Sequence, residues 1–173
     1  PASRGTILRE LAAAKGIKSS CIVLYQGLIT RERCIDEIVA ATEYVGDDVA
    51  LAILGHGIDE WSDPPSRIPP GRRIVHLPHV AYEKLFDYTA SADIGLLFYR
   101  NTCRNNFYCA PNKLYEYIMM GLPVITCNYP GLVAFVEGEE IGICVDTEDP
   151  CAIAGAINRI AGDEALRNTM SRN

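Results

Sequence analysis

The stretch YCAPNKLYEYIMMGLPVITC, from Tyr108 to Cys127, predicts a helix that leads directly into a strand. Its apolar residues recur at helical spacing through 112–120, and Gly121 with the Leu-Pro pair after it ends the helix and turns the chain. We expect Asn112 to be the N-cap, because its side chain can accept a hydrogen bond from an N–H group of the first turn. The apolar strand that follows is typical of a sheet whose faces are covered by helices.

This helix also carries a polar face that folding alone does not require. Asn112, Lys113 and Glu116 lie away from the apolar stripe. Glu116 is one residue too late for a capping box, whose position is held by Tyr115. One interpretation is a surface ion pair between Lys113 and Glu116, which would stabilise the helix by only about 0.2–0.5 kcal/mol. The other is that the carboxylate accepts hydrogen bonds from two vicinal hydroxyl groups, such as those of a ribose.

The remainder of the chain repeats this alternation of helix and apolar strand. The expected strands are 21–27, 49–55, 73–77, 93–99, 123–127 and 142–146. The expected helices are 4–15, 33–44, 82–91, 112–120, 130–136 and 150–161, and the Pro-rich segment 61–71 is expected to be a loop. Because the strands are continuous apolar runs, we predict an α/β fold, a Rossmann-like doubly wound parallel sheet of about six strands with helices on both faces.

The composition limits the kinds of protein that this chain can be. A length of 173 residues suits a single domain, 1–173, with a core that needs no disulfides. A net charge of −6 argues against nucleic acid as a partner. The apolar runs fall short of the roughly 20 residues that a membrane-spanning helix needs.

The cysteine content points to a compartment and argues against a metal site. The 7 cysteines are an odd number without a C-x-x-C pair, which indicates a reducing environment, so we expect a cytoplasmic protein. His76 and His79 could be joined with Cys103 and Cys109 in a zinc site. Their spacing matches no compact metal motif, so no metal is expected.

The loop YQGLITRERC follows the first expected strand, at the edge where doubly wound sheets bind ligands. Gly27 allows the backbone to turn or to approach a ligand closely. Arg31 and Arg33 precede a helix start, where cations oppose the helix dipole and anions are favoured. Either an anion binds beside these arginines, or they pair with Glu32 or Glu37.

The loop LGHGID after the second expected strand matches only the beginning of a dinucleotide fingerprint. Glu60 stands where the third glycine would be, and WSDPPSR follows where a helix should begin. We therefore expect a glycine turn at this edge of the sheet and no nicotinamide or flavin cofactor.

Taken together, these segments resemble the retaining glycosyltransferases of family 4, the glycosyl transferases group 1. APNKLYEYIMMGLPVI resembles the family's donor-site signature, and LYQGLITRERCIDEIVAA resembles its first-strand segment with the glycine and a basic phosphate-binding residue. LAILGHG and VHLPHVAYEKLFDYTASADIGLLF resemble the second-strand turn and the stretch that passes the nucleobase. The resemblance covers 21–161 and implies the C-terminal, donor-binding domain of the GT-B fold.

The resemblance implies a nucleotide-sugar donor and assigns residues to it. Glu116 would hold the ribose hydroxyls. Arg33, in the place of the family's lysine, would hold the pyrophosphate with Arg31 as a helper. Backbone N–H groups of 111–114, which include Asn112, Lys113 and Leu114, would face the phosphate and sugar. Two positions depart from the family pattern: Tyr108 replaces a glutamate that contacts the donor sugar, and Leu28 replaces an arginine.

The resemblance also implies what lies beyond this chain. Glycosyl transfer would proceed with retention and without a metal or other cofactor, to a saccharide or lipid-linked acceptor. The N-terminal acceptor domain is absent, so we expect a fragment whose partner is that missing half. We expect the isolated domain to be inactive, with its catalytic groups unassigned, and peripheral membrane association to occur through the missing half.

Other functions remain as alternatives. A sugar-nucleotide epimerase of the same architecture would need acid–base carboxylates in the cleft, and the region before Glu116 offers none. A phosphorylase would need a lysine-bound pyridoxal phosphate, but Lys113 has no surrounding cofactor pattern. A non-enzymatic Rossmann-like interaction or receiver module would need acidic residues after the first strand, and CIVLYQG has none.

Overall fold

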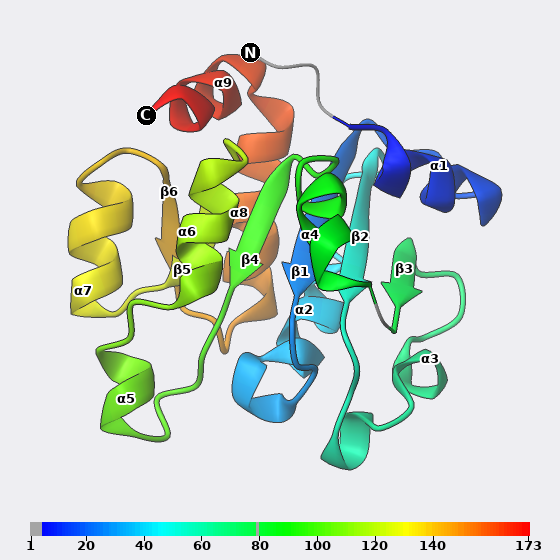
Figure 1. Ribbon diagram of the computed structural model, residues 1–173, viewed down its shortest axis with the longest axis horizontal. Coiled ribbons are helices and arrows are strands. Elements are labelled where there is room, and N and C mark those ends of the chain that lie inside the picture. The colour runs from blue at the N-terminus through cyan, green and yellow to red at the C-terminus, as the bar shows by residue number, and fades with distance from the viewer. Residues whose placement is uncertain (1–4, 79) are drawn as a thin grey trace.

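The computed structural model describes residues 5–78 and 80–173, and its centre is one parallel sheet of 6 strands (Figure 1). The strands are β1 Cys21–Gln26, β2 Val49–Leu54, β3 Ile74–Leu77, β4 Ile94–Leu97, β5 Val124–Cys127 and β6 Gly142–Val145. Their order in space is β3-β2-β1-β4-β5-β6. This order reverses between β1 and β4, as in Rossmann folds, and the predicted fold class is confirmed.

Helices cover both faces of the sheet. The longer ones are α1 Ile7–Ala14, α2 Ile35–Ala41, α4 Tyr82–Thr89, α6 Asn112–Met119, α8 Pro150–Gly162 and α9 Glu164–Arg172. Figure 1 shows α4 and α6 in front of the sheet and α2 and α8 behind it, and α2 packs against α8. None of the helices in the described part of the chain is long and apolar enough to cross a bilayer.

Several shorter elements lie in the loops. They are the 3-10 turns Arg31–Arg33 and Asp59–Trp61, the one-turn helices α3 Pro64–Arg67, α5 Arg104–Phe107 and α7 Pro130–Leu132, and the π-helical turn Val133–Glu137. The prediction of a loop through 61–71 is wrong in part, since α3 lies within it. Side-chain contacts with the preceding segment hold this turn, because Arg67 donates a hydrogen bond to the carbonyl oxygen of Glu60 and its guanidinium lies over the ring of Trp61.

Helix boundaries also differ from the sequence predictions. Asn112 is the first residue of α6 and Pro111, in an extended conformation, takes the N-cap position, so the prediction of Asn112 as the N-cap is wrong. The sequence pattern did not predict α9, whose N-cap Asp163 accepts a hydrogen bond from the Leu166 N–H. The expected start of the first helix at Arg4 lies outside the described residues.

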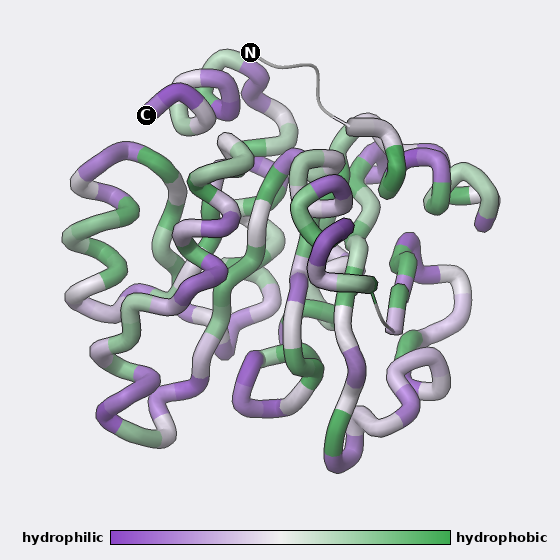
Figure 2. The backbone as a smooth tube through the Cα atoms, viewed as in Figure 1, coloured by the Kyte–Doolittle hydropathy of each residue, from purple (hydrophilic) through white to green (hydrophobic). Residues whose placement is uncertain are grey.

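The core consists of the strands and the helix faces turned toward them. β1, β2, β4 and β5 are buried at every position, and Figure 2 shows apolar residues along the strands and polar residues in many of the outer loops. Such burial on both faces is the reason that these strands are continuous apolar runs rather than alternating ones.

A glycine in β4 lets helix α6 lie close to the centre of the sheet. A Cβ atom on Gly95 would come within 2.6 Å of the Tyr117 ring. The hydroxyl group of Tyr117 donates to the carbonyl oxygen of Leu96 at 3.2 Å and accepts from the N–H of Gln26 at 3.3 Å. The ring therefore fastens α6 to β1 and β4 together.

We expect Gly95→Ala to destabilise the protein by about 1–3 kcal/mol, because the added methyl group overpacks the buried Tyr117 ring. The matched control is Gly155→Ala on the exposed face of α8, where a Cβ meets nothing within 4 Å. That variant should gain roughly 0.5–1 kcal/mol, since alanine favours a helix. Urea unfolding followed by circular dichroism measures both, and shifts of the same sign would contradict the packing argument.

Candidate functional site

A pocket of about 430 Å³ opens at the carboxyl edge of the sheet, over the strands next to the reversal of strand order. Its lining comes from the ends of β1 and β2, the segment after β3, and helices α4 and α6. The lining residues are Gln26, Gly27, Leu28, Leu54, Gly55, His56, Pro78, Val80, Leu85, Asn112, Lys113 and Glu116. Ligands of doubly wound sheets bind at this position, so this pocket is the candidate site.

Two glycines allow the loops after β1 and β2 to touch at the floor of the pocket. Gly27 and Gly55 have φ angles of +123° and +147°, which few other residues adopt. A Cβ on Gly55 would lie 1.8 Å from the carbonyl oxygen of Gly27, and one on Gly27 would lie 2.0 Å from Nζ of Lys113. The backbone of Gly27 therefore lies close to the Lys113 side chain, as well as turning the chain after β1.

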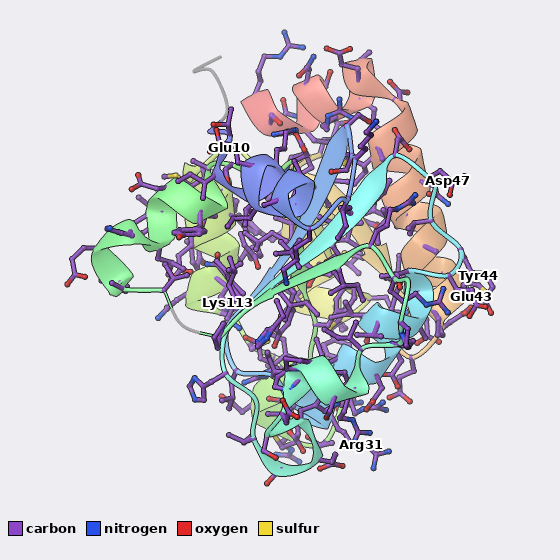
Figure 3. The ribbon with its side chains drawn as sticks, turned by 90° about the vertical axis from the view of Figure 1, so that its right-hand side faces the viewer. Glu10, Arg31, Glu43, Tyr44, Asp47 and Lys113 are labelled. Atoms are coloured by element: carbon purple, nitrogen blue, oxygen red, sulfur yellow. The ribbon has the colours of Figure 1, made fainter. Side chains whose placement is uncertain are left out.

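The amine of Lys113 is held inside the pocket. Figure 3 shows it within the molecule beside the loop after β1, and its Nζ lies 5.3 Å from the centroid of the Tyr25 ring. Burial and the nearby Arg33 guanidinium lower the pKa of Lys113 from 10.5 to about 8, against the opposite effect of the Glu116 carboxylate. The lysine is therefore still cationic near neutral pH, but in surroundings that disfavour its charge.

Arg33 supplies a second cation that is incompletely paired. Its guanidinium carbon lies 3.9 Å from the centroid of the Tyr99 ring. Its Nη1 is buried and, within the described residues, has no hydrogen-bond partner. A buried N–H group without an acceptor is costly, and an anion would supply acceptors for it.

Glu116 lies about one helical turn after Lys113 on α6 and lines the same pocket. One carboxylate oxygen, Oε2, accepts a hydrogen bond of 2.7 Å from the side-chain amide of Gln26. The oxygen of that amide in turn accepts 2.8 Å from the hydroxyl group of Thr89 in α4. The carboxylate thus lies in the pocket with one oxygen held by the protein.

The wall formed by the segment after β3 and by α4 is apolar. Its side chains are Leu54, Pro78, Val80 and Leu85. The pocket thus combines an apolar wall, the Glu116 carboxylate and the Lys113 amine, and the Arg33 guanidinium lies close enough to this amine to lower its pKa. It suits a ligand with an apolar ring system, hydroxyl groups and an anionic group.

Three of the predicted site residues lie elsewhere. Arg31 is exposed and pairs with Asp36 at 3.7 Å and with Glu60 at 3.5 Å, and Figure 3 shows it at the lower edge of the molecule. Tyr108 is 71% exposed, with its ring edge-on to Phe107. Neither residue is among those that line the pocket. Arg33 is not among them either, but its charge acts on the lining residue Lys113.

The third is Leu114, whose side chain is buried in the core. Its N–H donates to the carbonyl oxygen of Pro111 at 2.9 Å, so this group does not face the pocket as predicted. The N–H groups of Asn112 and Lys113 stand at the helix start, where a helix offers no acceptors of its own.

The acidic partners that the sequence suggested for the two arginines are engaged with other residues. Glu37 pairs with Arg100, and Glu32 accepts from Thr102 at 3.1 Å. Arg100, in the loop after β4, is therefore fastened to α2 through Glu37.

Sequence reasoning missed Gln26, Tyr99 and Thr89. Gln26 left a trace in the sequence, because it is the one polar residue in the strand CIVLYQ and stands at the carboxyl edge. Thr89 left none, since its role depends on the packing of α4 against β1.

No group of three or more His, Cys, Asp or Glu residues in 5–78 and 80–173 is arranged to hold a metal ion. His79, one of the residues considered for zinc, lies outside the described residues.

The glycosyl transferases group 1 family model matches residues 20–163, a range that contains the whole pocket. The chain belongs to this family. The group 1 domain is 27% identical over 165 residues to CapM of Staphylococcus aureus, a capsular polysaccharide biosynthesis glycosyltransferase. That alignment covers 92% of this chain and 41% of CapM.

Solved structures of similar fold agree with this placement. The C-terminal domain of LpcC, a group 1 protein from Francisella tularensis, matches with a TM-score of 0.74 at 15% identity, over 100% of this chain and 90% of that one. Anabaena HepE, solved with UDP and glucose, matches with a TM-score of 0.75 at 17% identity, over 95% of this chain and 45% of HepE. The fold is that of a GT-B C-terminal domain. This chain spans less than half of the length of CapM and of HepE.

We expect the Lys113 charge to make stability depend on pH. The folded pKa of about 8 lies below the unfolded value of 10.5, so the unfolded chain binds more protons between these values. The contribution of Lys113 to stability is therefore complete above about 10.5 and is lost as the pH falls through about 8.

The measurement is the free energy of unfolding of the wild type minus that of Lys113→Met, from pH 6.5 to 10. This difference should rise with pH, and Arg33→Met should reduce the rise by removing the neighbouring cation. A difference that is flat across this range would contradict the buried placement of the amine.

Proposed function

We propose that this chain is the nucleotide-diphosphate-sugar-binding half of a retaining glycosyltransferase that transfers a glycosyl group to a saccharide or lipid-linked acceptor. In this proposal 1–173 form one donor-binding domain, and the acceptor domain is the N-terminal half of the same GT-B enzyme. Membership of the group 1 family supports the class of reaction. The similarity to CapM supports a role in polysaccharide synthesis.

The observation that carries the proposal is the set of chemical groups that line the pocket or lie beside it. The apolar wall around Pro78 and Val80 suits a nucleobase, and the Glu116 carboxylate suits the two ribose hydroxyls. Arg33 and Lys113 then suit the diphosphate, with the buried Nη1 of Arg33 as a donor to its oxygens. HepE, whose fold is similar, was solved with UDP and glucose, which supports a uridine donor as the first to test.

These cations would also assist the chemistry. The diphosphate gains negative charge as the bond to the sugar breaks, and cations already in place stabilise that charge. The N–H groups of Asn112 and Lys113 at the start of α6 add to this effect. Transfer itself needs the acceptor positioned by the other half of the enzyme, so this domain alone would bind donor but transfer little.

The pocket gives less support to an epimerase. Such an enzyme needs carboxylates for acid–base chemistry at the sugar, and Glu116 is the one carboxylate among the described residues that line the pocket. Gln26 holds one oxygen of this carboxylate, and the place of Glu116 on α6 puts it in the pocket. We therefore assign the carboxylate to ribose binding.

Calorimetric titration with UDP, GDP and ADP tests the proposal. We expect one of them to bind in the high micromolar to millimolar range, and Glu116→Ala to weaken it by about 10- to 100-fold, as for a charged hydrogen-bond acceptor. Glu164→Ala, at an exposed position of α9, is the matched control and should leave affinity unchanged. Failure of all three to bind a folded domain would contradict the proposal.

Substituting each arginine in turn tests which of the two binds the diphosphate. Arg33→Met should weaken binding of the nucleoside diphosphate by about tenfold or more, because it removes the guanidinium beside Lys113. Arg31→Met should weaken it much less, since Arg31 is engaged with Asp36 and Glu60. Equal losses would instead support the sequence prediction that Arg31 assists Arg33.

A further inference from the structure

The geometry points to Gln26 and Thr89 as positioning residues that hold the Glu116 carboxylate ready for the ribose. This inference rests on the proposed function and deepens it. It names the residues that prepare the contact, neither of which was predicted from the sequence.

The three side chains form one hydrogen-bonded series across three elements. Thr89 at the end of α4 donates to Oε1 of Gln26 at 2.8 Å, and Nε2 of Gln26, at the end of β1, donates to Oε2 of Glu116 in α6 at 2.7 Å. Thr89 is 0% exposed and Gln26 is 3% exposed. Water therefore competes little for these bonds.

The direction of the series is fixed by chemistry. A carboxylate can only accept, so the NH2 group of Gln26 faces Glu116 and its amide oxygen faces Thr89. The Thr89 hydroxyl group lies within donating distance of this amide oxygen and, at 2.9 Å, of the carbonyl oxygen of Leu85. An NH2 group can only donate, and it therefore favours a carboxylate at Glu116 as the acceptor. The other carboxylate oxygen, Oε1, is left to accept from a ligand hydroxyl.

Folding alone gives little reason for a glutamine at this position. The other five residues of β1 are buried and hydrophobic, so a buried side-chain amide is the exception in this strand. Burying a side-chain amide is costly unless both its ends are hydrogen-bonded, and here the second partner is a residue of the pocket.

Holding the carboxylate before the ligand arrives increases affinity. A free glutamate on a helix surface samples several rotamers, and freezing it on binding costs side-chain entropy. In this chain Gln26 restricts Glu116 during folding instead. The inference therefore predicts an effect that is confined to ligands with ribose hydroxyls.

The experiment compares two ligands on the 173-residue chain. The probe is whichever of UDP, GDP and ADP binds the wild type, together with its 2′,3′-dideoxy analogue. Gln26→Met has a similar length but no amide. It should weaken binding of the ribose ligand by about three- to tenfold, as expected for one hydrogen bond, and leave the affinity for the dideoxy ligand unchanged. Circular dichroism verifies that the variant is folded.

An equal loss for both ligands, or no loss for either, overturns the inference, because a structural role would not discriminate between them. The proposed function is tested separately by the wild type and by Glu116→Ala. If Glu116→Ala abolishes the preference for the ribose ligand and Gln26→Met leaves this preference unchanged, the proposed function stands and the positioning role fails. If no diphosphate binds, both fail.

A second pair of variants decides the matter if Gln26→Met does not fold. Thr89→Val keeps the shape but removes the hydroxyl donor, and Thr89→Ser keeps the donor. Thr89→Val should lose part of the preference for ribose over dideoxy ligand, and Thr89→Ser should retain it. The same preference in both variants overturns the inference.

Discussion

The buried ring of Tyr117 is the contact on which the site depends. Its hydroxyl group joins the backbone of β1, through Gln26, to that of β4, through Leu96, and its ring occupies the space that Gly95 leaves free. Burying a hydroxyl group without hydrogen-bond partners costs about 1–3 kcal/mol. The Tyr117 ring is therefore most stable where its hydroxyl group reaches both the Gln26 N–H and the Leu96 carbonyl oxygen. This fixes the start of α6 at the reversal of strand order.

The electrostatics of the pocket follow from that placement. Because α6 begins close to the ends of β1 and β2, the Lys113 amine is placed against Gly27 and near the Arg33 guanidinium. Two cations close together in a partly buried site raise the free energy of the empty pocket, as the lowered pKa of Lys113 reflects. An anion relieves this cost on binding, which is how functional sites commonly differ from the rest of a fold.

The difference between the two arginines illustrates how local geometry selects a ligand-binding side chain. Arg31 and Arg33 lie in a single 3-10 turn, which has three residues per turn, so side chains two apart point in different directions. The turn ends at Cys34, which has a left-handed conformation with φ of 53°, and helix α2 starts anew after it. One arginine therefore faces the acidic residues Asp36 and Glu60, and the other lies over the Tyr99 ring and beside Lys113.

The sequence by itself determined the sheet and the polar face of α6. Continuous apolar strands that alternate with amphipathic helices are compatible with few folds other than a covered parallel sheet, and helical spacing places Lys113 and Glu116 apart from the buried stripe. Only the tertiary structure decided the one-turn helices, the placement of Arg33 rather than Arg31 beside Lys113, and the partners of Glu116. Gln26 lies 63 residues from Thr89 and 90 from Glu116, so no local pattern could have linked them. Such bonds form because packing brings α4, β1 and α6 together.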